Sequence, residues 1–265
     1  MRVELQAELD ALEAGFQEAG EIALRAIRGA TDALRMQDVE LCDEVIAFDD
    51  EVDQRYIAVE RQVEMTLARQ TPVAGDLRLV LAILHSALHV ERIGDQCVTI
   101  AKLTKLSSHL GTKHAVIESL VDMGERCAEM VKVSLTAFSN RDVDQARSLH
   151  QLDELVDRAN RQVFREVLGY VHDPEALEWG MRQITVARCF ERIGDNAVDI
   201  GEQTAFLVTG EFAEFTDASH DPRPLEKPSD RPLTASSRDG YPFQPACTAI
   251  SRRRRNCSSG TKPLR

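Results

Sequence analysis

Hydrophobic residues recur at helical spacing through most of the chain, and this pattern predicts six long helices. In one stretch Leu77, Leu81, Leu84 and Leu88 are separated by four, three and four residues. This is the stripe that one helix presents to another in a bundle. Short polar or proline-containing segments separate the periodic regions. The expected helices cover residues 3–35, 39–69, 73–106, 113–138, 143–171 and 174–209.

Capping residues support several of these helix starts. Asp38 precedes the second helix, Thr71 stands before Pro72, and Asp173 stands before Pro174. The side chain of Ser, Thr, Asp or Asn satisfies free backbone N–H groups at a helix start, and proline is favoured at the first helical position. We therefore expect Thr71 to cap the third helix and Asp173 to cap the sixth.

The six predicted helices form two related sets of three. FDDEVD at 48–53 is repeated as LDELVD at 152–157, and ERIGDQCVTI at 91–100 is repeated as ERIGDNAVDI at 191–200. The offsets are 104 and 100 residues, and three antiparallel helices can bury one shared apolar seam. The predicted fold is all-α, with tandem three-helix bundles at 1–108 and 109–217 and a disordered tail at 218–265.

Charge is distributed unevenly over the 265 residues. The formal net charge is -12, but residues 218–265 hold ten Lys/Arg against four Asp/Glu, together with seven of the nine prolines. Residues 1–217 therefore carry a net charge of -18, which opposes nucleic acid or an anionic membrane as the main ligand. Hydrophobic content of 43% is enough for a core, and no apolar run approaches the length of a membrane span.

Cysteine usage and the N-terminal sequence indicate a cytoplasmic protein. The six cysteines show no C-x-x-C spacing, which favours scattered reduced thiols over a disulfide framework or a zinc site. Acidic residues occupy the N-terminal segment where an export signal would need an apolar run.

Acidic residues interrupt the apolar stripes at corresponding places in the two repeats. Glu91 and Asp95 continue the leucine stripe of the third predicted helix, and because they are one turn apart both carboxylates project to the same side. A carboxylate on a packing seam is costly unless a positive charge accompanies it. The full set is Asp49, Asp53, Glu91 and Asp95 in the first repeat, and Asp153, Asp157, Glu191 and Asp195 in the second.

Two interpretations of these carboxylates stay open. In one, they flank a partly hydrated seam and pair with Arg92, Arg192 or Arg188. In the other, each bundle forms an all-oxygen site suited to Mg or Mn, or to an iron cluster. Gly94 and Gly194 directly precede Asp95 and Asp195, and each is either tolerated on an exposed face or marks close helix approach.

The two E-R-I-G-D elements, each preceded by a D-x-x-V-D element, resemble the phosphate-uptake regulator family, PhoU, over residues 1–215. The resemblance implies a cytoplasmic homodimer or higher oligomer that is not an enzyme and is at most peripheral to the membrane. It implies a negative regulator of phosphate uptake and of the phosphate-starvation response. Such a protein acts as an adaptor between the ATPase subunit of the phosphate ABC transporter and a phosphate-sensing histidine kinase.

The resemblance also implies a set of metal ligands, since some members of the family bind metal ions or iron clusters through E/D-x-x-x-D motifs. By position, the ligands here would be the eight carboxylates already named, supported by Arg92, Gly94, Arg192 and Gly194. The chain departs from the family pattern after its last helix, because residues 218–265 have no counterpart in the relatives.

Three other functions are weaker. A di-iron oxidase needs E-x-x-H ligands, which occur nowhere in the sequence, and Thr185 and Cys189 replace His85 and His89 in the second repeat. A scaffolding or metal-binding bundle without a phosphate-signalling role would show the same apolar seams. Nucleic-acid binding through the basic tail is opposed by the acidic body.

Overall fold

The computed structural model describes residues 2–215, and every regular element in that range is an α-helix. This confirms the all-α prediction, while the predicted disordered tail lies outside the described residues. No helix in this range is both long enough and apolar enough to cross a membrane. The elements are α1 (Arg2–Met36), α2 (Val39–Ala47), α3 (Asp49–Gln70), α4 (Ala74–Ser107), α5 (His114–Asn140), α6 (Val143–Leu168) and α7 (Pro174–Thr209).

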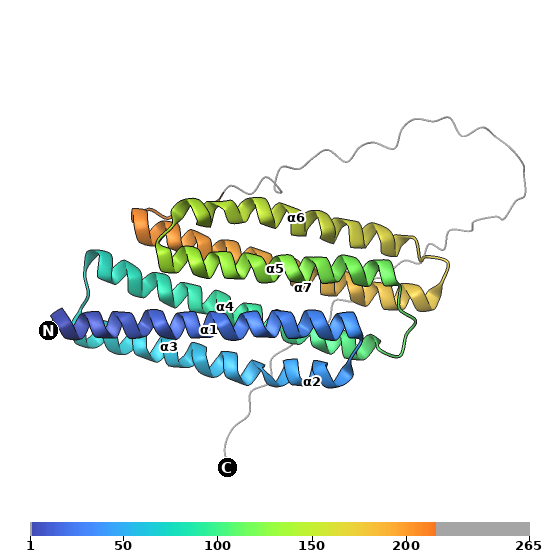
Figure 1. Ribbon diagram of the computed structural model, residues 1–265, viewed down its shortest axis with the longest axis horizontal. Helices are drawn as coiled ribbons and strands as arrows, with labels where there is room; N and C mark the ends of the chain where they lie inside the picture. The colour runs from blue at the N-terminus through green and yellow to red at the C-terminus, as the bar shows by residue number, and fades with distance from the viewer. Residues whose placement is uncertain (1, 216–265) are drawn as a thin grey trace, which may run out of the picture. The chain divides into compact units, whose positions relative to one another are not determined.

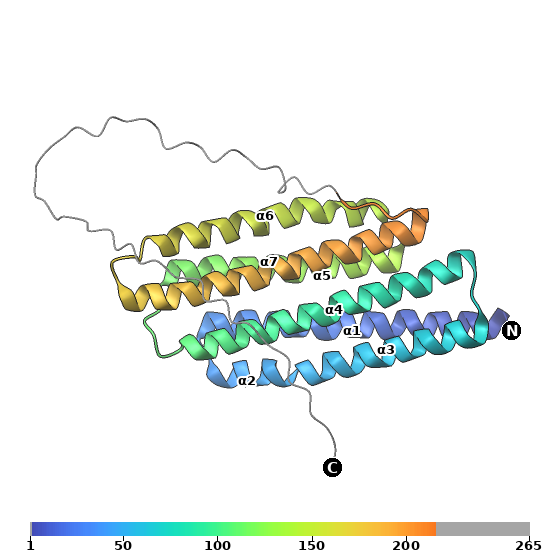
Figure 2. The ribbon, with the colours of Figure 1, turned by 180° about the vertical axis from the view of Figure 1, so that it is seen from behind.

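The helices form the two predicted sets (Figures 1 and 2). In the first, α3 packs on α1 and α4, and in the second, α6 packs on α5 and α7. The sets meet through α1 against α5 and α4 against α7. These four helices are therefore an inner layer, and α3 and α6 lie on its outside.

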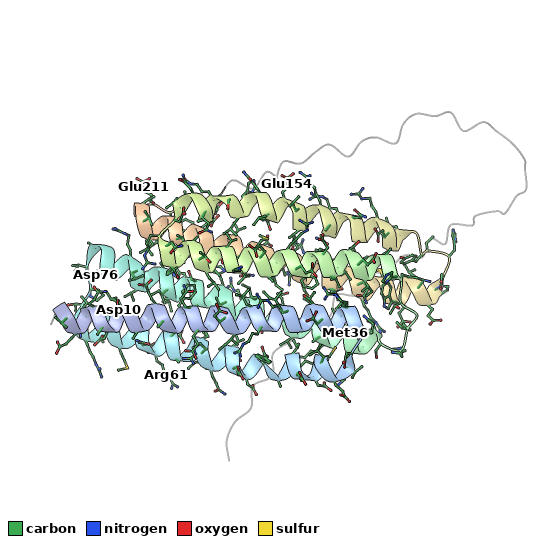
Figure 3. All side chains as sticks on the ribbon, viewed as in Figure 1. Asp10, Met36, Arg61, Asp76, Glu154 and Glu211 are labelled. Carbon is green, nitrogen blue, oxygen red and sulfur yellow. The ribbon has the colours of Figure 1, made fainter. Side chains whose placement is uncertain are left out.

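A single apolar core runs through both sets. Phe16 of α1 and Phe138 of α5 are fully buried, with ring centroids 4.8 Å apart. The cluster that contains them includes buried residues from all seven helices. Charged side chains such as Arg61 and Glu154 project outward (Figure 3). This continuous burial of apolar surface is the main force that holds the two sets together.

The predicted helix over 39–69 is divided at Phe48. The N–H of Phe48 still donates to the carbonyls of Glu44 and Val45, and the residue keeps helical φ and ψ of -64° and -20°. The Arg25 guanidinium lies 5.4 Å from the centroid of the Phe48 ring. α3 then begins with three acidic residues, which are favourable at a helix N-terminus. The division is therefore a local break in a nearly continuous path.

Two of the three predicted caps are confirmed. The side chain of Asp38 accepts hydrogen bonds from two backbone N–H groups of α2, and Asp173 accepts one from Ala176. The prediction for Thr71 is wrong, because Thr71 ends α3 in a left-handed conformation with φ of 44°. α4 begins only at Ala74 and has no side-chain cap, because Thr71 is used for the chain reversal between antiparallel helices.

The segment after α7 turns back onto the helix. The N–H of Phe215 donates to the buried Glu202 carboxylate at 2.7 Å. The Phe215 ring lies over Gly201, where an added Cβ would be 3.2 Å from the ring. Phe215 therefore holds the end of this segment against α7.

Candidate functional site

The eight predicted carboxylates lie on two pairs of packed helices. α3 contacts α4 in the first set, and α6 contacts α7 in the second. The first pair carries Asp49 and Asp53 on α3 with Glu91 and Asp95 on α4, and the second carries Asp153 and Asp157 on α6 with Glu191 and Asp195 on α7.

The four carboxylates of the first set lie within electrostatic reach of one another. Burial raises the pKa of Glu91, and the charges of Asp95, Asp53 and Asp49 raise it further, while Arg92 opposes them. Burial also raises the pKa of Asp49, again with contributions from Asp53 and Asp95. Like charges that repel one another favour protonation or a nearby cation.

Glu191 is the most deeply buried member of the second set, with only 8% of its surface exposed. Burial raises the pKa of Glu191 to about 7, with added repulsion from Asp195 and Asp157 and an opposing effect of Arg188. One carboxylate oxygen of Glu191 accepts a hydrogen bond from the Arg188 guanidinium. The other oxygen, Oε2, is buried and has no hydrogen-bond donor in the described part of the chain.

The arginines near these carboxylates have different roles. Arg188 contacts Glu191 directly, whereas Arg92 and Arg192 are exposed and act on Glu91 and Glu191 at longer range. Arg161 was not among the predicted partners, but its Nη1 lies 3.2 Å from the Asp157 carboxylate. The four-residue spacing of Asp157 and Arg161 on one helix was the signal for this pair.

The two glycines before the acidic residues mark close helix approach. Both are buried, and a Cβ added to Gly94 would lie 3.1 Å from a methyl group of Val52 on α3. A Cβ added to Gly194 would lie 2.9 Å from the Asp153 carboxylate on α6. Each glycine thus lets the carboxylate-bearing helices pack closely, which offsets its low helix propensity.

The carboxylates suit a hard cation by donor type but not by their present arrangement. All eight offer oxygen, as Mg and Mn prefer, and Glu191 Oε2 is an unsatisfied buried acceptor. Within residues 2–215, however, no group of three or more His, Cys, Asp or Glu side chains converges closely enough to hold a metal ion. The exposed side chains of Asp53, Asp95 and Asp195 would have to turn inward to complete such a site.

A polar contact joins the two sets near the second carboxylate group. Nδ1 of His89 on α4 lies 2.9 Å from Oδ1 of Asn196 and 3.2 Å from Oδ2 of Asp199, both on α7. His89 therefore lies at the contact between the inner helices, whereas His85 is exposed.

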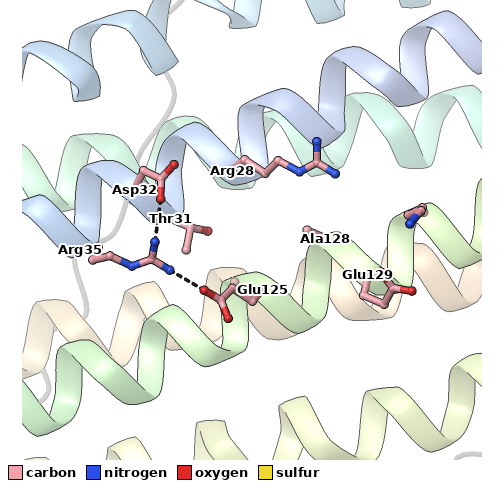
Figure 4. A pocket seen from close by; sticks show the side chains of 9 residues that line it. Arg28, Thr31, Asp32, Arg35, Glu125, Ala128 and Glu129 are labelled. Carbon is pink, nitrogen blue, oxygen red and sulfur yellow. Dashed lines mark hydrogen bonds and ion pairs between the residues drawn. The ribbon is translucent and has the colours of Figure 1, made fainter.

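A separate pocket of about 300 Å³ lies between α1 and α5 (Figure 4). Arg35 forms ion pairs there with Asp32 at 3.0 Å and with Glu125. The pocket is also lined by Arg28, Glu129 and Lys132, so acidic and basic groups are balanced.

Comparisons with known proteins place this architecture in a family. The model of the PhoU domain matches residues 16–104 and 120–204, one match in each helix set. The chain is 31% identical over 218 residues to a phosphate-specific transport system accessory protein PhoU homolog of Pseudomonas aeruginosa, covering 82% of this chain and 88% of the relative. A homolog of the same name from Clostridium acetobutylicum is 30% identical over 215 residues, covering 80% and 97%.

Solved structures agree with the sequence matches. The crystal structure of PhoU from Pseudomonas aeruginosa superposes with a TM-score of 0.73 at 30% identity, covering 78% of this chain and 99% of that one. The phosphate transport system regulatory protein PhoU from Streptococcus pneumoniae gives a TM-score of 0.72 at 30% identity, covering 79% and 99%. With both repeats matched and the fold shared, the chain belongs to the PhoU family.

Proposed function

We propose that this protein is an accessory protein of phosphate-specific transport that represses phosphate uptake and the phosphate-starvation response when phosphate is plentiful. The observation that carries this proposal is the match of the PhoU domain to both helix sets, together with relatives named as accessory proteins of that transport system. Similarity extends over most of the length of these relatives, and it is not confined to one of the two helix sets.

The proposed mechanism is that of a cytoplasmic, non-enzymatic adaptor. The body of residues 1–217 carries a net charge of -18, and acidic faces accelerate encounter with basic surfaces on a partner. The partners we propose are the ATPase subunit of the phosphate ABC transporter and a phosphate-sensing histidine kinase. Self-association into a homodimer or a higher oligomer would present these faces in more than one copy.

Deletion of the gene tests this proposal. We expect a phosphate-responsive reporter to be expressed at high phosphate as strongly as under starvation, and polyphosphate to accumulate, because the repressing adaptor is absent. Reporter activity and polyphosphate content are measured in the wild type, the deletion strain and a strain complemented with the full chain.

A second complementing gene that encodes only residues 1–217 keeps Phe215 and its contact with Glu202. Restored repression by this shorter chain assigns the function to the helical body. Normal repression in a deletion strain that has no second copy of the gene would contradict the proposed function.

A second candidate function is a metal-binding or scaffolding bundle without a phosphate-signalling role. The raised pKa values of Glu91 and Glu191 favour it, because a bound cation would relieve the repulsion among their neighbours. This candidate predicts the same fold but no change in the reporter.

Metal analysis tests the second candidate. We expect protein purified without chelator to contain Mg, Mn or Fe, and an Asp95→Asn/Asp195→Asn variant to contain much less, because each set loses one proposed ligand. An Asp50→Asn/Glu154→Asn variant, changed at exposed positions on the same helix pairs, is the matched control. Equal, negligible metal in all three proteins would reject metal binding.

A further inference from the structure

The second helix set has exposed apolar side chains on α6 and α7. Phe164 and Leu168 on α6 are 50% and 56% exposed, and Met181 on α7 is 57% exposed. Phe164 and Ile184 line a groove of about 420 Å³ together with Asn160, Arg161 and Arg165. Large apolar side chains gathered in a groove are typical of a binding surface.

The internal repeat supplies a comparison for this surface. With the offset of 104 residues that aligns α3 and α6, the positions of Phe164 and Leu168 are occupied in the first set by Glu60 and Glu64. Arg165 corresponds to Arg61, so the basic residue is present in both sets. The outer helix of the first set thus packs with acidic residues at these two positions.

The groove is also basic within an acidic body. Its lining includes two arginines and no acidic residue. Arg161 pairs with Asp157, while Nε of Arg165 donates to the Arg161 carbonyl at 3.2 Å and its guanidinium has no carboxylate partner among residues 2–215. An acidic ligand would neutralise Arg165 without displacing an existing ion pair.

The shape of the surface favours a helix as ligand. Phe164 and Leu168 are one turn apart on α6, and Met181 and Ile184 are one turn apart on α7. One residue of each pair, Phe164 or Ile184, lines the groove between these packed antiparallel helices, into which the ridge of another amphipathic helix can fit. A membrane surface is a poorer fit, because Phe164 and Ile184 line a concave groove and not a flat apolar face.

We propose that the α6–α7 groove binds an acidic amphipathic helix of a partner protein, with Phe164 and Ile184 receiving its apolar side chains and Arg165 its carboxylates. This proposal rests on the proposed adaptor function, because an adaptor must have a partner protein to bind. Binding itself is tested with purified components, so its failure is distinguishable from failure of the reporter experiment.

The test measures fluorescence anisotropy of a labelled synthetic helix with the full chain at low salt. The probe has leucines along one face and glutamates elsewhere, over about four turns. We expect the acidic peptide to bind, and a version with lysine in place of glutamate to bind at least about tenfold more weakly, because it loses the contact with Arg165. The net negative charge of the body would make the lysine peptide bind more tightly than the glutamate peptide. Non-specific electrostatic attraction therefore cannot produce the expected result.

Two variants and a control localise the binding. Phe164→Glu places the residue type of the first set at that position and should weaken binding about tenfold, and Arg165→Glu should weaken it comparably. Both positions are exposed, and circular dichroism checks that the helices stay folded. Ile57→Glu, at an exposed apolar position on α3, is the matched control and should leave the affinity unchanged.

Several results would overturn the proposal. Equal or tighter binding of the lysine peptide, or unchanged affinity of Phe164→Glu, would exclude an acidic helix in this groove. Self-association abolished by Phe164→Glu would assign the groove to a second copy of the chain. Phe164-dependent binding to phosphatidylglycerol vesicles would assign it to a membrane, and competition by a synthetic peptide of residues 238–258 would assign it to the chain's own basic segment.

Discussion

Phe190→Ala is expected to lower the free energy of unfolding by about 3–5 kcal/mol, the cost of removing a buried phenyl group and leaving a cavity. Phe190 is fully buried on α7, and its carbonyl accepts the thiol hydrogen of Cys127 on α5 at 3.1 Å. Its ring approaches Gly124, where an added Cβ would also contact Thr31 of α1. The ring therefore occupies a point where three inner helices meet, and urea unfolding measures its contribution.

The repeat provides the control for this prediction. Val90 occupies the corresponding position in the first set and is also buried. Val90→Ala removes less apolar volume and should cost about 2 kcal/mol. Equal losses for the two variants, or a loss below about 1 kcal/mol for Phe190→Ala, would show that the cavity at Phe190 collapses and that this junction is not tightly packed.

Glu191→Gln is expected to stabilise the protein at about pH 8, by up to about 3 kcal/mol, and to have little effect near pH 5. The pKa of Glu191 is about 7 in the folded protein, against 4.5 for an ordinary glutamate. The folded state therefore holds more protons than the unfolded state between these values. The contribution of Glu191 to stability is fully present below about pH 4.5 and is lost as the pH rises through about 7, whereas Gln stays neutral throughout.

Urea unfolding of both proteins at about pH 5 and about pH 8, in buffer with chelator, measures this difference. The control is Glu154→Gln, because Glu154 is exposed on α6 and its hydrogen bond with Arg158 lowers its pKa. Because its pKa is lowered, Glu154 is charged at both pH values. We therefore expect the effect of Glu154→Gln on the free energy of unfolding to be the same at both. If Glu191→Gln raised the free energy of unfolding by the same amount at both pH values, Glu191 would not be protonated in the folded protein near pH 5.

The sequence predicted most of the helical framework because the determining signals are local or repeated. Asp38 and Asp173 cap the helices that follow them, and the repeated FDDEVD and ERIGD elements correctly indicate two related sets of helices. Thr71 failed as a cap because the reversal between two antiparallel helices has its own backbone requirement. Phe48 gave no local signal for a break, since it keeps helical backbone angles.

The contacts between sets could not be predicted in the same way. The repeat shows which helices correspond, but not which faces of α1, α4, α5 and α7 meet. Gly124 is an example, because the sequence does not indicate that this glycine packs closely against Thr31 and Phe190. The sequence likewise named the eight carboxylates, but their distance from a common point depends on side-chain rotation and is not encoded by helical spacing.

The inner layer has a consequence for how the two halves of the chain diverged. Two identical helix sets packed through this layer would be related by twofold symmetry. Every amino-acid substitution would then occur twice in their interface. Fusion of the halves into one chain removes that restriction. His89 contacts Asn196 and Asp199 across the interface. At the positions that the repeat relates to these three residues, the chain has Cys189, Gln96 and Thr99, so this contact has no symmetric counterpart. A duplicated gene thereby encodes an asymmetric pair whose two outer surfaces are free to specialise for different ligands.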